Sequence, residues 1–341
     1  MARIRITHFM RRPRPNLFSL EQLHEDIRDS IAPECEMQVW VCRNFSNGLW
    51  PRAQDVWLAR KAQGDVNHVT GDVHYLTFLL NPNRTILTVH DLVGLHRLSG
   101  IKRFVFWFFW YWLPLKRCRT VVTISESTRR QLIESVRCDP SKVRVIHNNV
   151  SDDFRPADFV FRADRPHILQ IGTTPNKNIE RVAEALSGLG VHLVIVGPIS
   201  EPQKIALGRY GIDYENHVGL SREEIVWHYQ YCDMLIFVST YEGFGLPIVE
   251  AQAVGRPVVT SNILSMPEVA GSGACLVDPF DPVSIRTGVL RVINDDHYRN
   301  ELVAEGRVNV ARFRTEIVAD AYAALYREVA GDGGRRDPLI T

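Results

Sequence analysis

The chain has 341 residues, of which 45% are hydrophobic and 23% charged, a composition typical of globular proteins and unlike that of disordered ones. Its formal net charge is +1, which gives no bulk attraction to nucleic acid. The six cysteines are scattered, with no CxxC pair and no preceding signal peptide. We therefore expect reduced thiols in a cytoplasmic protein, and neither a disulfide framework nor a zinc site. The length suffices for two ordinary α/β domains.

Strand and helix signals alternate along the first half of the chain. Ile4 and Ile6 open a short strand, and residues 10–15 form a loop, because paired prolines stop both helices and strand ladders. Ser19 then caps a helix. Further buried strands are predicted at residues 37–41, 66–69, 86–89, 121–124 and 143–146.

Two groups of polar residues stand at carboxyl ends of these strands, where open parallel sheets bind ligands. Arg11, Arg12 and Arg14 lie in the first strand-to-helix loop, which is either a solvated basic loop or a contact for a phosphate or an acidic acceptor. His90 and Asp91 leave the strand at residues 86–89, so we expect them to be functional.

The most apolar segment is FVFWFFWYWLPL, at residues 104–115. It is shorter than the roughly 20 residues of a membrane span, is broken by Pro114, and is flanked by Lys and Arg. Two interpretations remain open. The segment is either a buried helix or a helix lying against the inner membrane leaflet.

The second half of the chain repeats the alternation after a polar hinge at residues 151–166. Strands are predicted at residues 168–171, 192–196, 214–218, 234–238 and 274–277, with helices at 179–189, 222–231 and 283–295. Such alternation predicts parallel sheets with right-handed crossovers. The expected domains are residues 1–155 and 156–316, followed by a helix at 317–330 that packs back on the first domain and a disordered tail at 331–341.

The most informative stretch is LIFVSTYEGFGLPIVEAQAVGRPVV, at residues 235–259. It predicts a strand, a glycine turn, a helix bounded by Pro247 and Gly255, and a second strand. Glu242 and Glu250 bracket the turn. A strand, a glycine loop and a helix N-terminus together form an anion site, here expected to hold the diphosphate of a nucleotide sugar. Neither G-x-G-x-x-G after the first strand nor G-x-x-x-x-G-K-[ST] occurs, which disfavours a dinucleotide enzyme or a P-loop protein.

EGFGLPIVE, from Glu242 to Glu250, closely resembles the E-x7-E motif of the retaining glycosyltransferases of family 4, bacterial surface-polysaccharide type. Further blocks resemble that family in the same order, at residues 85–92, 120–128, 143–150, 171–178, 261–271 and 276–281. The resemblance implies the GT-B fold, an α/β architecture in which two Rossmann-like domains with parallel sheets face each other across a cleft. The C-terminal domain would hold the donor.

The resemblance also implies roles for individual residues. Glu250 would bind the ribose hydroxyls, Glu242 the hydroxyls of the sugar, and Lys177 the diphosphate, while His90 would project towards the donor sugar from the first domain. His90, Glu242 and Lys177 are thus the expected catalytic residues. The remaining donor contacts would come from two glycine loops, at Gly172, Thr173, Gly243, Phe244, Gly245 and Leu246.

Candidates for acceptor or phosphate contacts lie in the first domain, at Arg11, Arg12, Arg14, Ser19, His68 and Asp72. Many family members carry an arginine directly after the glycine of the lysine loop, where this chain has Thr173. Either the phosphate clamp is weaker here, or an arginine of the first loop completes it.

The implied activity is a metal-independent, retaining hexosyl transfer. The UDP- or GDP-linked donor would be a substrate, with no separate cofactor and no metal. The acceptor would be a glycan or lipid-linked glycan in polysaccharide or lipopolysaccharide assembly, at the cytoplasmic face of the inner membrane. The alternatives on the same fold are a nucleotide-sugar 2-epimerase, a glycan phosphorylase and a non-catalytic scaffold subunit.

Overall fold

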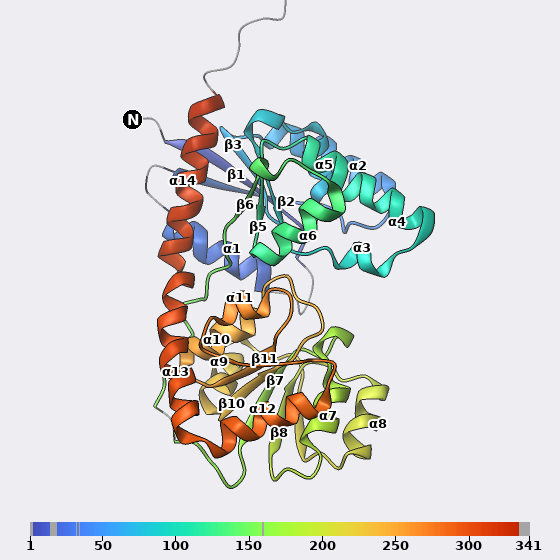
Figure 1. The fold of residues 1–341 in the computed structure, drawn as a ribbon. Coiled ribbons are helices and arrows are strands. Elements are labelled where there is room, and N and C mark those ends of the chain that lie inside the picture. The colour runs from blue at the N-terminus through green and yellow to red at the C-terminus, as the bar shows by residue number, and fades with distance from the viewer. Residues whose placement is uncertain (1–2, 14–18, 32, 34, 159, 334–341) are drawn as a thin grey trace, which may run out of the picture. The chain divides into compact units, whose positions relative to one another are not determined.

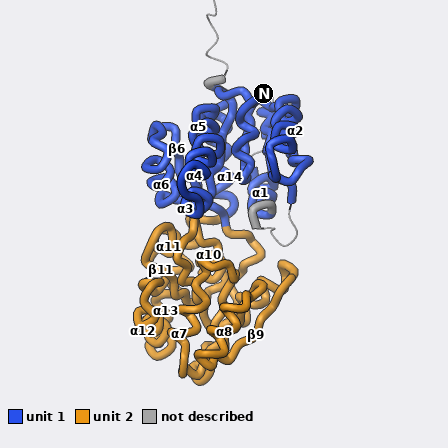
Figure 2. Tube along the Cα trace, turned by 90° about the vertical axis from the view of Figure 1, so that its right-hand side faces the viewer, with its two compact units in different colours: residues 1–149, 315–341 blue, residues 150–314 orange. Residues whose placement is uncertain are grey.

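The computed structural model describes residues 3–13, 19–31, 33, 35–158 and 160–333. The chain forms two compact units (Figure 2). Unit 1 consists of residues 1–149 and 315–341, and unit 2 of residues 150–314. The chain therefore leaves unit 1 once and returns to it with its last helix.

Unit 1 is built on a six-stranded parallel sheet with the strand order β2-β1-β3-β4-β5-β6 (Figure 1). Its strands are β1 (Ile4–Met10), β2 (Cys35–Val41), β3 (Val66–Val69), β4 (Thr85–Val89), β5 (Thr120–Thr123) and β6 (Val143–Val145). β1 runs to Met10, one residue into the segment where we expected a loop. The other strands confirm the predicted positions to within two residues.

The helices of unit 1 are α1 (Ser19–Ser30), α2 (Leu49–Ala59), α3 (Val93–Arg97), α4 (Gly100–Phe106), α5 (Leu113–Lys116), α6 (Glu126–Val136) and α14 (Thr315–Gly333). Ser125 caps α6 by accepting a hydrogen bond from the Thr128 N–H at 3.0 Å. α14 packs against α1, β1 and β3, which confirms the expected return of the last helix to the first domain. It is longer than expected, and residues 334–341 of the predicted tail lie outside the described residues.

The aromatic segment at residues 104–115 is continuous helix, with a π-helical stretch, η4 (Trp107–Trp112), between α4 and α5. One side of it is core, since Tyr111 and Leu115 are buried in unit 1. The other side is open, since Phe104 and Phe109 are at least half exposed. Among the described residues, no helix is both long and apolar enough to cross a membrane.

Unit 2 contains a second six-stranded parallel sheet, with the order β12-β11-β10-β7-β8-β9. Its strands are β7 (His167–Ile171), β8 (His192–Val196), β9 (Tyr214–His217), β10 (Met234–Phe237), β11 (Val258–Ser261) and β12 (Cys275–Val277). The chain starts in the middle at β7, winds outward to β9, and then returns to place β10 on the other side of β7. This order confirms the predicted Rossmann-like fold, and its switch point lies between β7 and β10.

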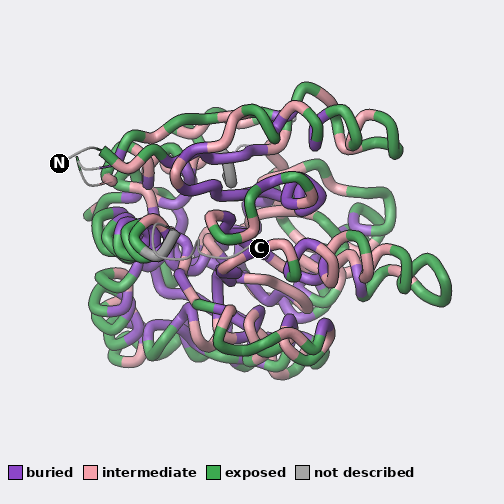
Figure 3. The backbone as a smooth tube through the Cα atoms, turned by 90° about the horizontal axis from the view of Figure 1, so that it is seen from above, coloured by how far each residue is buried: buried purple, intermediate pink, exposed green. Residues whose placement is uncertain are grey.

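The helices of unit 2 are α7 (Ile179–Leu186), α8 (Glu201–Arg209), α9 (Arg222–Tyr231), α10 (Leu246–Val254), α11 (Met266–Ala270), α12 (Pro282–Asn294) and α13 (Asp296–Val310). α9 has the predicted limits, because Ser221 and Glu224 form a capping box at its start. We did not predict α8 or α13. Figure 3 colours the buried residues purple along the backbone. The apolar residues of the central strands are among the buried ones.

Candidate active site

The switch point of unit 2 brings together the loops that follow β7 and β10. Several hydrogen bonds join these loops. Among them, the Thr240 N–H donates to the Asn176 carbonyl at 2.8 Å, and the Asn176 side-chain amide donates to the Tyr241 carbonyl at 2.9 Å. Ligands of open α/β sheets bind at such a point, outside the carboxyl ends of the strands. The predicted lysine loop and glycine turn therefore form one site.

Lys177 and Glu242 are an ion pair within this site. The Lys177 Nζ lies 2.6 Å from the Glu242 Oε1, and each side chain is only 16% exposed. The ammonium also lies 4.4 Å from the centre of the Phe237 ring, a favourable cation–π distance. Gly172 makes room for the lysine, because its φ is +84° and a Cβ there would lie 2.9 Å from the Lys177 Cε. The structure thus places three predicted donor residues together.

The glycine turn leads directly into α10. Gly245 adopts a φ of +112° at the N-cap, and a proline follows at the start of the helix. The Ser265 hydroxyl lies within hydrogen-bond distance of the carbonyls of Glu242 and Phe244, at 3.0 and 2.8 Å, and holds the turn. Phe244 is buried against Phe313, so its side chain packs and only its backbone can serve a donor. The positive end of α10 is therefore directed to this turn.

Glu250, in the second turn of α10, has a partner that we did not predict. The Tyr229 hydroxyl, from α9, donates to the Glu250 Oε2 at 2.6 Å. Burial raises the pKa of Glu250, and the hydrogen bond from Tyr229 opposes that rise. Burial, with the Glu250 charge beside it, raises the pKa of Tyr229, so the phenol stays a donor. Glu250 is thus an acceptor whose ionised form depends on Tyr229.

Thr173 occupies the position where many family members carry arginine. Its hydroxyl donates to the Pro198 carbonyl at 2.7 Å, and its own carbonyl accepts from the Gln203 side chain at 2.8 Å. These bonds fix the lysine loop against the segment that follows β8. Thr173 therefore supplies rigidity to the loop and no charge.

In unit 1, His90 follows β4 and is buried. Its Nε2 lies 2.8 Å from the Thr70 carbonyl, which can only accept, so the proton is on Nε2. The His24 Nε2 lies 3.2 Å from the same oxygen. The His90 Nδ1 is buried and has no hydrogen-bond partner among the described residues. Asp91 has a local role, since its carboxylate accepts from the Val93 N–H at 2.9 Å.

The basic loop after β1 lines a small pocket of about 50 Å³ with Asp72. The Arg11 guanidinium lies 3.8 Å from the Asp72 carboxylate, and Arg12 donates to the Arg43 carbonyl at 2.9 Å. Arg14 lies outside the described residues, as does the side chain of Ser19.

His68 differs from the other acceptor candidates, because it is fully buried. Its Nδ1 lies 2.7 Å from the Tyr326 hydroxyl and its Nε2 lies 2.7 Å from the Thr88 hydroxyl. Both ring nitrogens are therefore occupied inside unit 1. Neither ring nitrogen of His68 is left to contact an acceptor substrate, so the expected acceptor contact of His68 is corrected.

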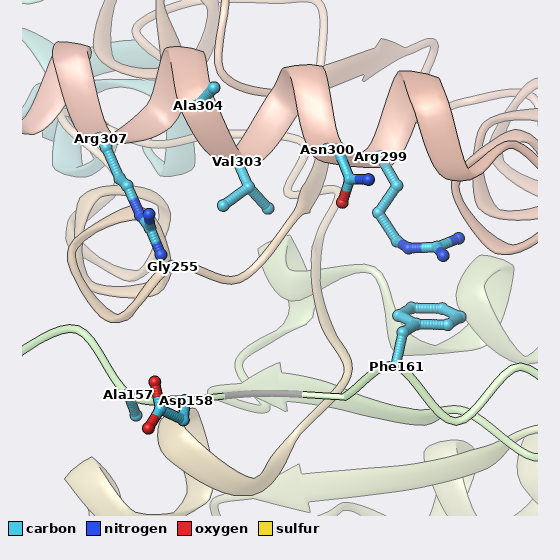
Figure 4. Close-up of a pocket in the computed structure, with 9 residues that line it drawn as sticks. All are labelled: Ala157, Asp158, Phe161, Gly255, Arg299, Asn300, Val303, Ala304 and Arg307. Atoms are coloured by element: carbon cyan, nitrogen blue, oxygen red, sulfur yellow. The ribbon is translucent and has the colours of Figure 1, made fainter.

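A larger pocket of unit 2, of about 490 Å³, lies elsewhere (Figure 4). It is lined by Gly255, at the C-terminal end of α10, and by side chains of α13. Arg299 covers the ring of Phe161 in this pocket at 3.9 Å. The donor residues Lys177 and Glu242 do not line it, so it is distinct from the site at the switch point.

A doubly wound sheet with a paired lysine and a helix N-terminus at its switch point is the arrangement of a nucleotide-binding α/β protein. Comparison with known proteins gives the family. Residues 152–309 match the family described as glycosyl transferases group 1, and residues 18–154 match Glycosyltransferase Family 4. The two matches together cover most of the chain, which therefore belongs to the family 4 glycosyltransferases.

Curated relatives include the serotype-specific mannosyltransferase WbdA of Escherichia coli, 28% identical over 260 residues, which are 68% of this chain and 32% of WbdA. The O-antigen chain mannosyltransferase RfbU of Salmonella typhimurium is 27% identical over 228 residues, 63% of this chain and 62% of RfbU. The chain thus spans about a third of the length of WbdA and under two thirds of RfbU.

Solved structures show the same fold. HepE of Anabaena, in complex with UDP and glucose, has a TM-score of 0.76 and 15% identity, over 95% of this chain and 100% of its own. The sucrose-phosphate synthase of Thermosynechococcus elongatus has a TM-score of 0.77 and 18% identity, and the match covers 97% of this chain and 100% of that protein's chain. The expected GT-B fold class is confirmed.

Proposed function

We propose that the protein is a retaining glycosyltransferase. It moves a hexose-type sugar from a UDP- or GDP-linked donor to a glycan or lipid-linked glycan in polysaccharide or lipopolysaccharide assembly. The observation that carries the proposal is the Lys177–Glu242 pair at the switch point, with Glu242 in the glycine turn that leads into α10. The relatives WbdA and RfbU, named as mannosyltransferases, support a hexose donor.

Lys177 is proposed to bind the donor diphosphate. Its ammonium is held by Glu242 and the Phe237 ring, so it is oriented before the donor arrives. An ammonium about 4 Å from a phosphate oxygen contributes roughly 4 kcal/mol at an effective dielectric near 20. The N-terminus of α10 adds its dipole to the same group. Together they stabilise the charge that builds up on the leaving diphosphate, and we expect no metal to be needed for that purpose.

Retention follows if the acceptor attacks the face from which the nucleotide leaves. The acceptor oxygen forms a bond to the anomeric carbon as the bond to the diphosphate breaks, and the departing phosphate oxygen takes the acceptor proton. Such a step needs no general base of raised pKa. Glu242 is free to bind the sugar hydroxyls once the diphosphate engages Lys177, and Glu250 accepts from the ribose.

We propose that unit 1 supplies His90 for the donor sugar, and Arg11, Arg12 and Asp72 for the acceptor. The buried Nδ1 of His90 supports this role, because Nε2 already contacts the Thr70 carbonyl, while Nδ1 has no partner among the described residues and is left for a hydroxyl of the sugar. The pocket beside Arg11 and Asp72 offers charges of both signs, as polar glycan hydroxyls require.

The test is transfer by the purified protein from a panel of UDP- and GDP-sugars to a lipid-linked acceptor. NMR of the product should show the anomeric configuration of the donor. Transfer should be lost in a Lys177→Ala, Glu242→Ala double variant, and transfer that survives would refute the site. An epimerised donor formed without acceptor would instead indicate an epimerase. Phosphate-dependent release of sugar-1-phosphate would indicate a phosphorylase. Absence of nucleotide binding in calorimetry would indicate a scaffold subunit.

We also propose that α4 rests on the cytoplasmic face of an anionic membrane. Ile101, Phe104 and Phe109 are exposed apolar side chains, and Lys102 and Arg103 lie among them. Apolar and basic residues on one exposed helical segment suit the interface of a negatively charged leaflet. We do not count Trp107 in this surface, because its indole N–H donates to the Ser135 carbonyl at 2.9 Å.

A further inference from the structure

Unit 2 holds a second group of polar side chains, on β9 and α9. Glu215 and His217 are two residues apart on the edge strand β9, so their side chains point to the same face of the sheet. α9 brings His228 to them, with its ring centre 4.5 Å from that of His217. One ligand-type atom from each of the three residues lies within 4.8 Å of the other two.

The nitrogens of this group lack the partners that buried polar atoms normally have. The His217 Nε2 is buried and lies 3.2 Å from the Glu215 Oε1, yet the two form no hydrogen bond of acceptable geometry. His228 is only 7% exposed, and within the described part of the chain neither of its ring nitrogens forms a hydrogen bond. Two imidazoles thus converge on one carboxylate, whose second oxygen also lies 3.9 Å from the His192 Nε2.

The donor atoms also suit a transition metal. Zinc binds imidazole nitrogens and carboxylate oxygens, which are the atoms that these three residues offer.

We propose that Glu215, His217 and His228 form a binding site for one divalent transition-metal ion, with zinc the preferred ion. Two nitrogens and one carboxylate oxygen are a common zinc ligand set, and zinc is bound tetrahedrally at about 2.0–2.2 Å. Tetrahedral bonds of that length separate ligand atoms by about 3.4 Å, so small side-chain rotations close the present group around an ion. Glu215 is half exposed, which leaves the fourth position to water.

The site goes beyond the proposed sugar transfer and does not depend on it. An ion there would tie the edge strand β9 to α9, the helix that carries Tyr229 beside His228. It would therefore stabilise unit 2, because an ion that binds only the folded state raises the free energy of unfolding.

The test is calorimetric titration of ZnCl₂ into the full-length protein, first stripped of metal with EDTA and dialysed. We expect one saturable zinc per chain and a higher melting temperature with zinc. His217→Ala and Glu215→Gln should each weaken binding more than about tenfold, since even groups that only orient a metal ligand cost 10–100-fold. His297→Ala, which removes an exposed histidine of unit 2, should bind as the unaltered protein does.

Melting curves without metal establish that each variant is folded. Glu215→Gln keeps the size of an exposed side chain, so it tests the site even if His217→Ala does not fold. Failure of the unaltered protein to bind zinc, or equal affinity in the folded Glu215→Gln variant and the His297→Ala control, would overturn the proposal. Neither result would bear on donor binding, which uses Lys177 and Glu250.

Discussion

Replacing Tyr229 with phenylalanine should shift the pH dependence of nucleotide binding. The change removes the hydroxyl that donates to Glu250 at 2.6 Å and leaves a ring that still packs against Phe154. A hydrogen bond to a charged group is worth about 1.5–3 kcal/mol, so its loss should disfavour the ionised form of Glu250 by about that amount. Burial would then be opposed only by the charges of Arg222 and Lys177, so the pKa of Glu250 should rise further.

The direction of the pH dependence follows from the form of Glu250 that binds the nucleotide. A ribose hydroxyl donates to the ionised carboxylate, so affinity falls as the pH drops through the pKa of Glu250. In the Tyr229→Phe variant that fall in affinity should begin at a higher pH. The pH dependence of the free energy of unfolding should also shift with the pKa of Glu250. A carboxyl whose pKa is higher in the folded state loses stability as the pH rises from its unfolded value to its folded value. That loss should extend to higher pH in the variant.

The assay is calorimetric titration of UDP and GDP across a pH series, with urea unfolding at each pH. Tyr231→Phe is the matched control, because it removes a hydroxyl from the same helix at an exposed position. Identical pH midpoints for the folded Tyr229→Phe variant and this control would refute the reasoning that Tyr229 tunes Glu250.

Three further changes test other contacts. Lys177→Met should lower kcat/KM by up to about a thousandfold, the equivalent of roughly 4 kcal/mol, whereas Lys204→Met, on the exposed face of α8, should leave steady-state kinetics unchanged. Gly172→Ala should destabilise the protein in urea by more than Gly188→Ala does: both glycines have positive φ, but only at Gly172 would the new Cβ meet another side chain, at 2.9 Å. The left-handed conformation alone costs about 1–2 kcal/mol, so equal losses would refute the contact argument. Phe104→Asp should weaken sedimentation with vesicles containing anionic lipid without lowering the melting temperature; unchanged sedimentation would contradict the membrane proposal.

The sequence determined most of the local structure. Ser125 and the Ser221–Glu224 box fix the starts of α6 and α9, because capping needs only residues three apart. Runs of buried apolar residues located the strands of both sheets for the same local reason. α8 escaped prediction because its EPQKIALGR segment has few apolar residues and no clear helical stripe. The apolar positions of residues 317–329 predicted the last helix, and its place after the completed second domain predicted its return to unit 1.

The contacts that define the site were decided only by the tertiary structure. Lys177 and Glu242 are 65 residues apart, and their pairing depends on the return of the chain to place β10 beside β7. The same winding sets Tyr229 against Glu250. In unit 1, α14 covers His68 with Tyr326, which turns a candidate acceptor contact into core. Sequence patterns report which face of one element is apolar, whereas a partner from a distant element depends on the order of strands in the sheet.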